Sequence, residues 1–115
     1  MDNLSMAENS KYLMVLSTCP DAKTAKEIAN ALVGKRIAAC VQIVSGIQSF
    51  FHWEGKVDNA EEYLMLIKTT AECYDDLESC IKSMHPYELP EIVAVPISTG
   101  SSEYLSWLDE CTLSS

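Results

Sequence analysis

A chain of 115 residues is long enough for one domain with its own hydrophobic core, since a domain of this size buries about two-thirds of its unfolded surface. Hydrophobic residues make up 48% of the chain, which excludes an intrinsically disordered protein. The formal net charge is −9 and Arg36 is the only arginine, which excludes nucleic acid as the main partner because phosphate binding needs clustered basic side chains.

The cysteines point to a reducing compartment. Their number, five, is odd and no Cys-x-x-Cys pair occurs, so the sequence indicates neither a disulfide framework nor a structural zinc site. The first ten residues lack the apolar core of a signal peptide, and no apolar run approaches the length of a membrane-spanning helix. We therefore predict a cytoplasmic protein without membrane insertion, with residues 1–10 as a disordered tail and residues 11–115 as a single domain.

The domain begins with a strand and a helix. Residues 12–16 are a continuous apolar run, typical of a strand that is buried on both faces. The next helix is predicted to open at Thr18-Cys-Pro-Asp21, since proline and aspartate suit a first turn, and to end at Gly34 as the C-cap residue. Its apolar stripe consists of Ala25, Ile28, Ala29, Leu32 and Val33.

A long hairpin is predicted next. Its legs are residues 37–53 and 56–69, with Glu54-Gly55 at the tip and a bend or bulge at Ser45-Gly46. Strands typically have about five or six residues, so these legs outgrow the sheet of a small domain. A projecting hairpin exposes a strand edge and aromatic side chains, which favours pairing with another subunit.

The second half repeats the order helix, then strand. Thr69-x-x-Glu72 matches a capping box, and the following helix is expected to stop at His85-Pro86. Residues 92–97 are predicted to form an edge strand, because Pro96 has no N–H to donate, and residues 103–111 a short last helix. The order βαββαβ predicts an α+β, ferredoxin-like fold with both main helices on one face of an antiparallel sheet.

Polar side chains concentrate in residues 82–92. Two prolines push the residues before them, His85 and Leu89, into an extended backbone, so this loop should be rigid. One hypothesis is a metal site, because imidazole and carboxylate suit divalent copper, zinc or nickel, while thioether and thiol suit monovalent copper. Its ligands would be His85, Glu91, Met84 and Cys19. The alternative is that the histidine caps a helix and the glutamate is solvated.

The sequence allows two other kinds of site. An enzyme would need a nucleophile beside a base, and although Cys19 and His85 could form such a pair, no sequence signature supports it, so no catalytic residue is predicted. A ligand-binding protein could use Lys56 and Lys68 to hold a carboxylate or phosphate, or these lysines could pair with nearby acidic residues. The exposed aromatic residues are expected to pack at an interface rather than to hold a ligand.

Taken together, the motifs resemble the CutA family of divalent-cation tolerance proteins. They are Thr18-Cys-Pro, Arg36-x-Ala-Ala-Cys-Val41, Trp53-x-Gly-Lys56, Lys68-Thr69, His85-Pro-Tyr-Glu-Leu-Pro-Glu91 and Tyr104-Leu-x-Trp107, in family order over residues 11–109. The resemblance implies a PII-like homotrimer whose hairpins pair across subunits, with intersubunit clefts that bind copper, another divalent cation or a small ligand. It implies no enzymatic activity. The alternative is a structural or signalling PII-like trimer without a metal-dependent role.

The resemblance also implies where the sites lie. Family members with a copper site are similar in using a cysteine, a histidine and a glutamate at positions that here hold Ser17, Met84 and Glu91, so only the glutamate is kept. Cys19 and His85 lie close by in sequence and could form a substitute, softer site. The cleft residues are predicted to be Ser17, Lys56, Lys68, Tyr87 and Glu88. The trimer-interface residues are predicted to be Phe51, Trp53, Tyr104 and Trp107.

Overall fold

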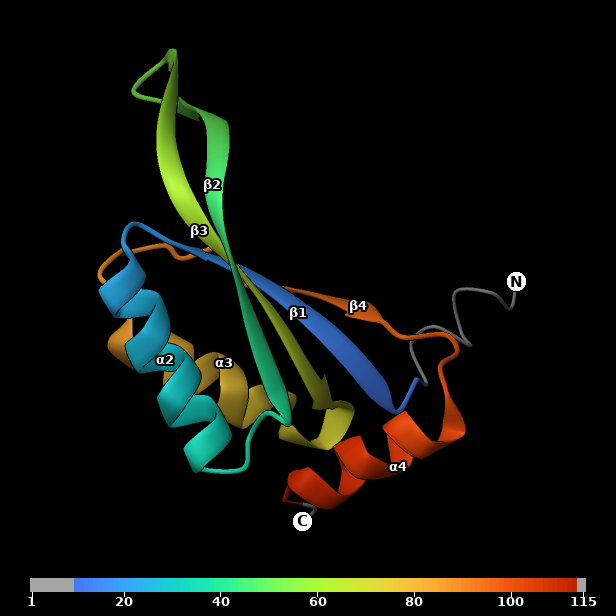
Figure 1. Ribbon diagram of the computed structural model, residues 1–115. Coiled ribbons are helices and arrows are strands. Elements are labelled where there is room, and N and C mark those ends of the chain that lie inside the picture. Colours follow the sequence, from blue (N-terminus) through green and yellow to red (C-terminus); the bar gives the residue numbers. More distant parts are fainter. Residues whose placement is uncertain (1–9, 114–115) are drawn as a thin grey trace.

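The computed structural model describes residues 10–113, and the predicted disordered tail lies outside this part of the chain except for Ser10. Along the described chain the elements are β1 (Tyr12–Cys19), α2 (Ala22–Gly34), β2 (Cys40–Trp53), β3 (Lys56–Thr70), the 3-10 turn η1 (Ala71–Cys73), α3 (Tyr74–Met84), β4 (Val93–Pro96) and α4 (Ser102–Cys111) (Figure 1). The strands form one antiparallel sheet in the order β2-β3-β1-β4. This arrangement confirms the predicted ferredoxin-like α+β fold, and Pro96 lies in an edge strand as expected.

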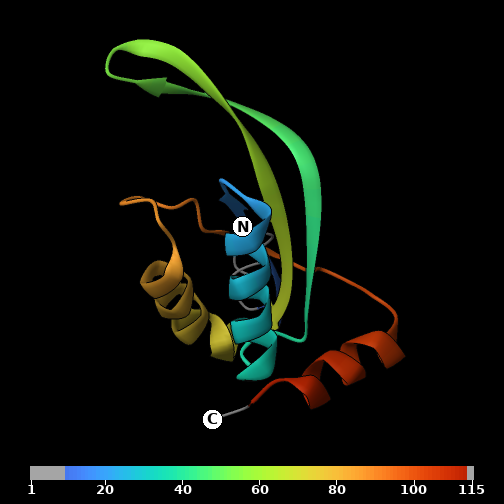
Figure 2. The same ribbon diagram turned by 60° about the vertical axis from the view of Figure 1, so that its left-hand side comes forward.

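The core lies between the sheet and the two main helices. Figure 2 shows α2 and α3 side by side on one face of the sheet, with α4 on the other side. Each helix turns one apolar stripe inward against alternate strand residues, as the 3.6-residue and two-residue periods require. The fully buried core side chains include Val15 of β1, Met65 and Ile67 of β3, Ile28 and Leu32 of α2, and Leu77 and Ile81 of α3.

The boundaries of the first helix differ from the prediction. β1 continues to Cys19, because its residues stay paired with β3 up to Tyr63, so the helix does not open at Thr18. It begins at Ala22, and Asp21 is the N-cap, accepting a hydrogen bond from the Thr24 amide at 2.7 Å. The helix ends at Gly34 as predicted, but the C-cap is Lys35. The left-handed residue that turns the chain is Arg36, at φ 60°.

The predicted capping box is wrong. Thr69 belongs to β3, and its hydroxyl donates to the Ile37 carbonyl at 2.6 Å instead of capping a helix. The chain turns through η1 before α3 begins, and the N-cap of η1, Thr70, makes no capping hydrogen bond with its side chain. β2 starts at Cys40 rather than at residue 37, because the Ile37 amide is held at the end of α2, where it donates to the Leu32 carbonyl.

The long hairpin is confirmed, and residues 47–62, called the arm from here on, leave the body of the sheet. β1 pairs with β3 only as far as Tyr63, so beyond that point β2 and β3 pair with each other alone. The predicted bulge lies between Val44 and Ile47. Both tip residues are left-handed, Glu54 at φ 51° and Gly55 at φ 76°, as a two-residue type I′ turn requires. The arm rises well clear of the helices (Figure 1).

Candidate functional site

His85 connects α3 to β1. Its backbone is extended as predicted, at φ −81° and ψ 137°, because Pro86 follows it. The side chain is only 8% exposed. Its Nε2 lies 2.7 Å from the Thr18 carbonyl oxygen and its Nδ1 accepts a hydrogen bond from the Tyr87 amide at 3.1 Å. Since a carbonyl can only accept, the proton sits on Nε2. Both ring nitrogens are therefore in use, and His85 binds a metal only by giving up one of these partners.

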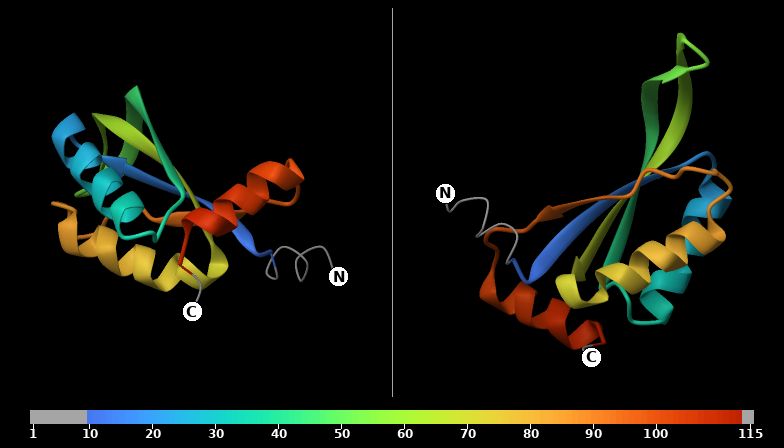
Figure 3. Two further views of the ribbon diagram at one scale, coloured as in Figure 1. Left: turned by 60° about the horizontal axis from the view of Figure 1, so that its bottom comes forward. Right: turned by 180° about the vertical axis from the view of Figure 1, so that it is seen from behind.

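Ser17 holds the other end of the same loop. Its side chain is fully buried, and its hydroxyl donates to the backbone carbonyl of Glu91 at 2.6 Å. The loop from Pro86 to Glu91, called the proline loop from here on, is thus fastened to β1 at both ends (Figure 3). The Glu91 side chain itself remains exposed. Ser17 therefore positions the backbone of the proline loop at Glu91.

Tyr87 connects the proline loop to the base of the arm. Its hydroxyl donates to Glu62 Oε2 at 2.8 Å, and its ring packs against the His85 ring at a centroid distance of 4.7 Å. Glu62 is only 6% exposed, so this carboxylate depends on its hydrogen bond. Burial, and secondly the Glu62 carboxylate, raises the pKa of Tyr87 to about 12, because a phenolate here would be poorly solvated and repelled. The phenol therefore stays a donor throughout the physiological range.

Glu62 was not predicted from the sequence. It follows Asp58 and Glu61 on the return leg of the hairpin, where acidic residues are normally solvated. The one feature of the sequence that hints at its burial is its position immediately before the apolar run 63–67, where the arm joins the sheet. Its burial arises from contact with a loop 25 residues later in the chain.

Cys19 is a protonated, inaccessible thiol. It is fully buried at the end of β1. Burial first, and then the carboxylates of Asp21 and Glu62, raises the pKa of the Cys19 thiol to about 11. The thiolate is the form that attacks substrates and binds metals, and it is a minor species at neutral pH in this geometry. The structure therefore gives no support to a nucleophilic role for Cys19.

The predicted metal ligands divide into two sets. Cys19 and His85 are buried, whereas Met84 is 37% exposed and Glu91 lies on the surface. Across residues 10–113, no three or more His, Cys, Asp or Glu side chains are grouped so that they could hold a metal ion. Within the described part of one chain, therefore, the cysteine, histidine and glutamate of the predicted set are not grouped so that they could hold a metal ion.

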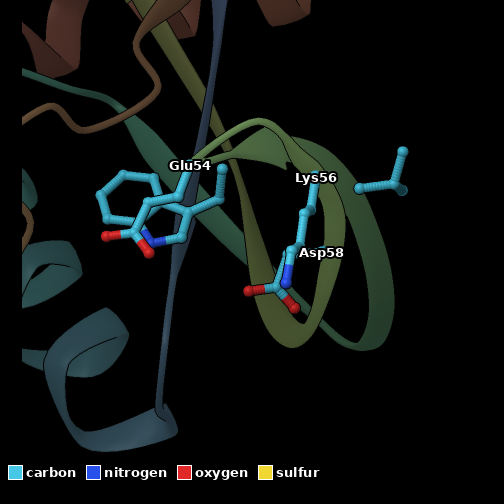
Figure 4. A pocket seen from close by; sticks show the side chains of 5 residues that line it. Glu54, Lys56 and Asp58 are labelled. Atoms are coloured by element: carbon cyan, nitrogen blue, oxygen red, sulfur yellow. The ribbon is translucent and has the colours of Figure 1, made fainter.

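The two predicted cleft lysines, Lys56 and Lys68, do not lie at the proline loop. Lys68 is on β3, and its ammonium donates to Gln42 Oε1 at 2.7 Å on the neighbouring strand. Lys56 lies at the tip of the arm, beside an open hollow of about 280 Å³ that is lined by Trp53, Glu54, Lys56, Val57 and Asp58 (Figure 4). Within one chain, therefore, only Ser17, Tyr87 and Glu88 of the predicted cleft belong to the proline loop or its anchors.

The predicted interface aromatics all keep substantial exposure. The exposed fractions are 40% for Phe51, 61% for Trp53, 41% for Tyr104 and 41% for Trp107. The first two lie on the arm, and the last two pack against each other on α4, with ring centroids 5.3 Å apart. They are available for contact with another molecule.

The fold and the site define a class of small ferredoxin-like proteins with a projecting arm and a proline loop held at the end of the first strand. Residues 13–111 match the family model described as "CutA1 divalent ion tolerance protein". The chain belongs to the CutA family of divalent-cation tolerance proteins, as the sequence motifs suggested. The family's name refers to tolerance of divalent ions and does not name a reaction.

Individual relatives agree with this assignment. The chain is similar to the divalent-cation tolerance protein CutA of Thermus thermophilus, with 48% identity over 86% of this chain and 96% of that protein, and to its solved structure with a TM-score of 0.86, covering 88% and 98%. Protein CutA of Mus musculus is 44% identical over 83% of this chain, which spans only 54% of the mouse protein. The solved CutA of Archaeoglobus fulgidus, described as periplasmic, is 41% identical with a TM-score of 0.85, covering 87% and 97%.

In the described part of the chain, every helix is too short or too polar to span a membrane.

Proposed function

We propose that this protein serves divalent-cation tolerance as a cytoplasmic homotrimer, which binds copper, another divalent cation or a small ligand in clefts between its subunits. The proline loop forms one wall of each cleft. Five free cysteines, three of them buried, suit a reducing compartment such as the cytoplasm.

The second face of the sheet carries the proposal. α2 and α3 cover one face, and alternate residues turn aliphatic side chains to the other, where Leu16 of β1 pairs with Leu66 of β3 and Val93 of β4. Val93 is 49% exposed and Val44, at the β2 edge, is 39% exposed. The apolar residues of this face are Met14, Leu16, Val44, Leu64, Leu66, Val93 and Val95.

This apolar face needs a cover that one described chain does not supply. α4 reaches only one end of the face, where Asp109 accepts a hydrogen bond from the Tyr12 hydroxyl at 2.7 Å. A contiguous aliphatic surface of this kind is typical of a protein–protein interface, and most soluble homo-oligomers are closed rings or dimers. The long arm adds unpaired strand edge beyond the sheet. Both features favour self-association.

The proline loop and the end of α3 supply the accessible donors of the proposed cleft. Glu88 and Glu91 present carboxylates to solvent, and Met84 presents a thioether. Oxygen donors suit divalent cations in general, and a thioether adds preference for copper. His85 bonds to the Thr18 carbonyl of β1, and Ser17 of β1 donates to the Glu91 carbonyl, so both hold this loop in place. A neighbouring subunit would complete the ligand set.

Calorimetric titration of the purified protein with copper and with zinc tests the cleft. We expect binding that weakens in Glu91→Gln and Met84→Leu, since each removes an accessible donor. Glu27→Gln, an exposed glutamate on α2, is the matched control and should bind as the wild type does. Binding that is unchanged in both Glu91→Gln and Met84→Leu would show that the site lies elsewhere.

A structural or signalling trimer without a metal role is the second candidate. It is favoured by the observation that both nitrogens of His85 already have backbone partners. In that case the titration gives no heat of binding with either metal, while the protein remains trimeric. The outcome separates the two candidates because only the first predicts a saturable heat.

A further inference from the structure

We propose that the hydrogen bond between Tyr87 and Glu62 is a latch that couples the proline loop to the arm. While the latch is closed, the loop fixes the direction in which the arm leaves the sheet. When the loop is displaced, Glu62 loses its donor and the arm bends at its base. The inference uses contacts within one chain, so it goes beyond the proposed cation binding and does not depend on it.

The base of the arm has the structure of a hinge. β3 is paired with β1 only up to Tyr63, and its pairing with β2 is interrupted by the bulge between Val44 and Ile47. Gly46 lies in this bulge at φ 78°, a left-handed backbone that favours glycine. A bulge bends its strand, and hinges are formed by a few residues that absorb a change in backbone angles. The arm bends where it leaves the sheet (Figure 2).

One side-chain hydrogen bond crosses this hinge among residues 10–113. It runs from the Tyr87 hydroxyl to Glu62 Oε2 at 2.8 Å, whereas the side chains of Gln48 and Asn59 join the two legs of the arm to each other. Glu62 pairs with Ile47, the first residue of β2 beyond the bulge. The latch therefore acts at the point where the arm would bend.

The burial of the Glu62 carboxylate makes the latch a two-state element. Glu62 is 6% exposed, and neither of the two ion pairs formed by residues 10–113 includes it. A buried carboxylate without a donor is strongly disfavoured relative to one in water. Glu62 is thus either bonded to Tyr87 with the arm held, or solvated with the arm bent away.

The loop side of the latch is braced against β1. The Tyr87 amide donates to His85 Nδ1 at 3.1 Å, and the two rings pack at a centroid distance of 4.7 Å. His85 Nε2 in turn donates to the Thr18 carbonyl at 2.7 Å. These contacts form a continuous path from β1 through the loop to the arm. Because coupling between two segments is reciprocal, displacing the loop should release the arm, and removing the Glu62 side chain should loosen the loop.

Hydrogen exchange followed by mass spectrometry tests the latch, because it reports the local opening of backbone hydrogen bonds. We expect the amides of residues 47–49 and 60–62 to exchange about tenfold faster in Tyr87→Phe than in the wild type, as the loss of one hydrogen bond to a charged group implies. Tyr12→Phe is the matched control and should leave these amides unchanged. Its hydroxyl also donates to a carboxylate, Asp109 Oδ2 at 2.7 Å, but at the other end of β1. Glu62→Gln keeps an acceptor and should retain most of the protection.

The reciprocal experiment measures the loop. Glu62→Ala removes the carboxylate and should speed exchange of the Tyr87 amide, which is bonded to His85. Asp58→Ala removes an exposed carboxylate further along the arm and should leave that amide unchanged. Far-ultraviolet circular dichroism confirms that the variants are folded, and Glu62→Ala decides the coupling if Tyr87→Phe does not fold.

The outcomes separate the latch from a general loss of stability. Exchange of the arm that is unchanged in Tyr87→Phe, or that rises equally in Tyr12→Phe or uniformly over the whole chain, would overturn the latch. Unchanged exchange of the Tyr87 amide in Glu62→Ala would overturn it as well. Calorimetry that detects no bound copper or zinc would overturn the proposed cation binding and leave the latch standing.

Discussion

Replacing Tyr87 by phenylalanine removes one hydroxyl and tests how the proline loop is held. The ring and its packing against His85 remain, but Glu62 Oε2 loses the donor that lies 2.8 Å away. A hydrogen bond to a charged group contributes about 1.5 to 3 kcal/mol. Because Tyr87 is 37% exposed, water replaces part of that bond, and we expect a loss of about 1 to 2 kcal/mol in the free energy of unfolding.

Urea unfolding at a fixed protein concentration measures this loss, since oligomerisation makes stability depend on concentration. In a thermal scan each 1 kcal/mol lost lowers the melting temperature by roughly 4 to 8 °C for a domain of about 100 residues. Glu62→Gln keeps an acceptor for the Tyr87 hydroxyl and should cost less than Tyr87→Phe. The double variant should show a coupling energy of about 1 kcal/mol between the two positions.

A Tyr87→Phe protein as stable as the wild type, to within about 0.3 kcal/mol, would refute the argument. It would mean that Glu62 is solvated in the assembled protein and does not depend on the loop. Equal and additive losses from the two single variants would refute it as well, because they would show that the two side chains do not interact.

Three further predictions concern the anchors, the thiols and the C-terminal helix. Ser17→Ala should lower the free energy of unfolding by about 1 kcal/mol in urea titrations, since the Glu91 carbonyl loses a buried donor. Cys19 should be the slowest thiol toward an aromatic disulfide at pH 8, because a pKa of about 11 leaves about a thousandth of it as thiolate; mass spectrometry should find the half-buried Cys40 and Cys111 modified first. Hydrogen bonds from Tyr12 and Lys11 lower the pKa of Asp109 below the ordinary 3.8. The ionised carboxylate therefore contributes its full stabilisation of the fold above pH 3.8, and this contribution is lost as the pH falls through the lower pKa of the folded state. In urea titrations run from pH 7 downward, the free energy of unfolding of Asp109→Asn should therefore fall less at acid pH than that of the wild type. An equal fall in both proteins would contradict this.

The fold was predictable because its signals are local. Apolar runs, one glycine-containing tip and a proline in the last strand are enough to place four strands and their order. Boundaries were less predictable, because they depend on tertiary partners. Thr69 has the sequence context of a helix cap, yet its hydroxyl bonds to Ile37, 32 residues earlier. β1 likewise outlasts its apolar run because β3 continues to pair with it.

The proline loop was predictable from the sequence, and the contacts of each residue in it were less so. The proline loop and its extended His85 follow directly from the two prolines. His85 faces inward, with the Thr18 carbonyl and the Tyr87 amide as its partners, because of how α3 packs against β1. The spacing of residues in the sequence does not show this packing. Glu62 was missed for a similar reason, since only the folded chain brings Tyr87 against the base of the arm.

Light scattering coupled to size-exclusion chromatography measures whether the protein is the proposed homotrimer. We predict a mass three times the chain mass of 12.7 kDa at micromolar concentration, because the aliphatic face of the sheet and the strand edges of the arm favour self-association. A mass equal to one chain would contradict the proposed intersubunit cleft.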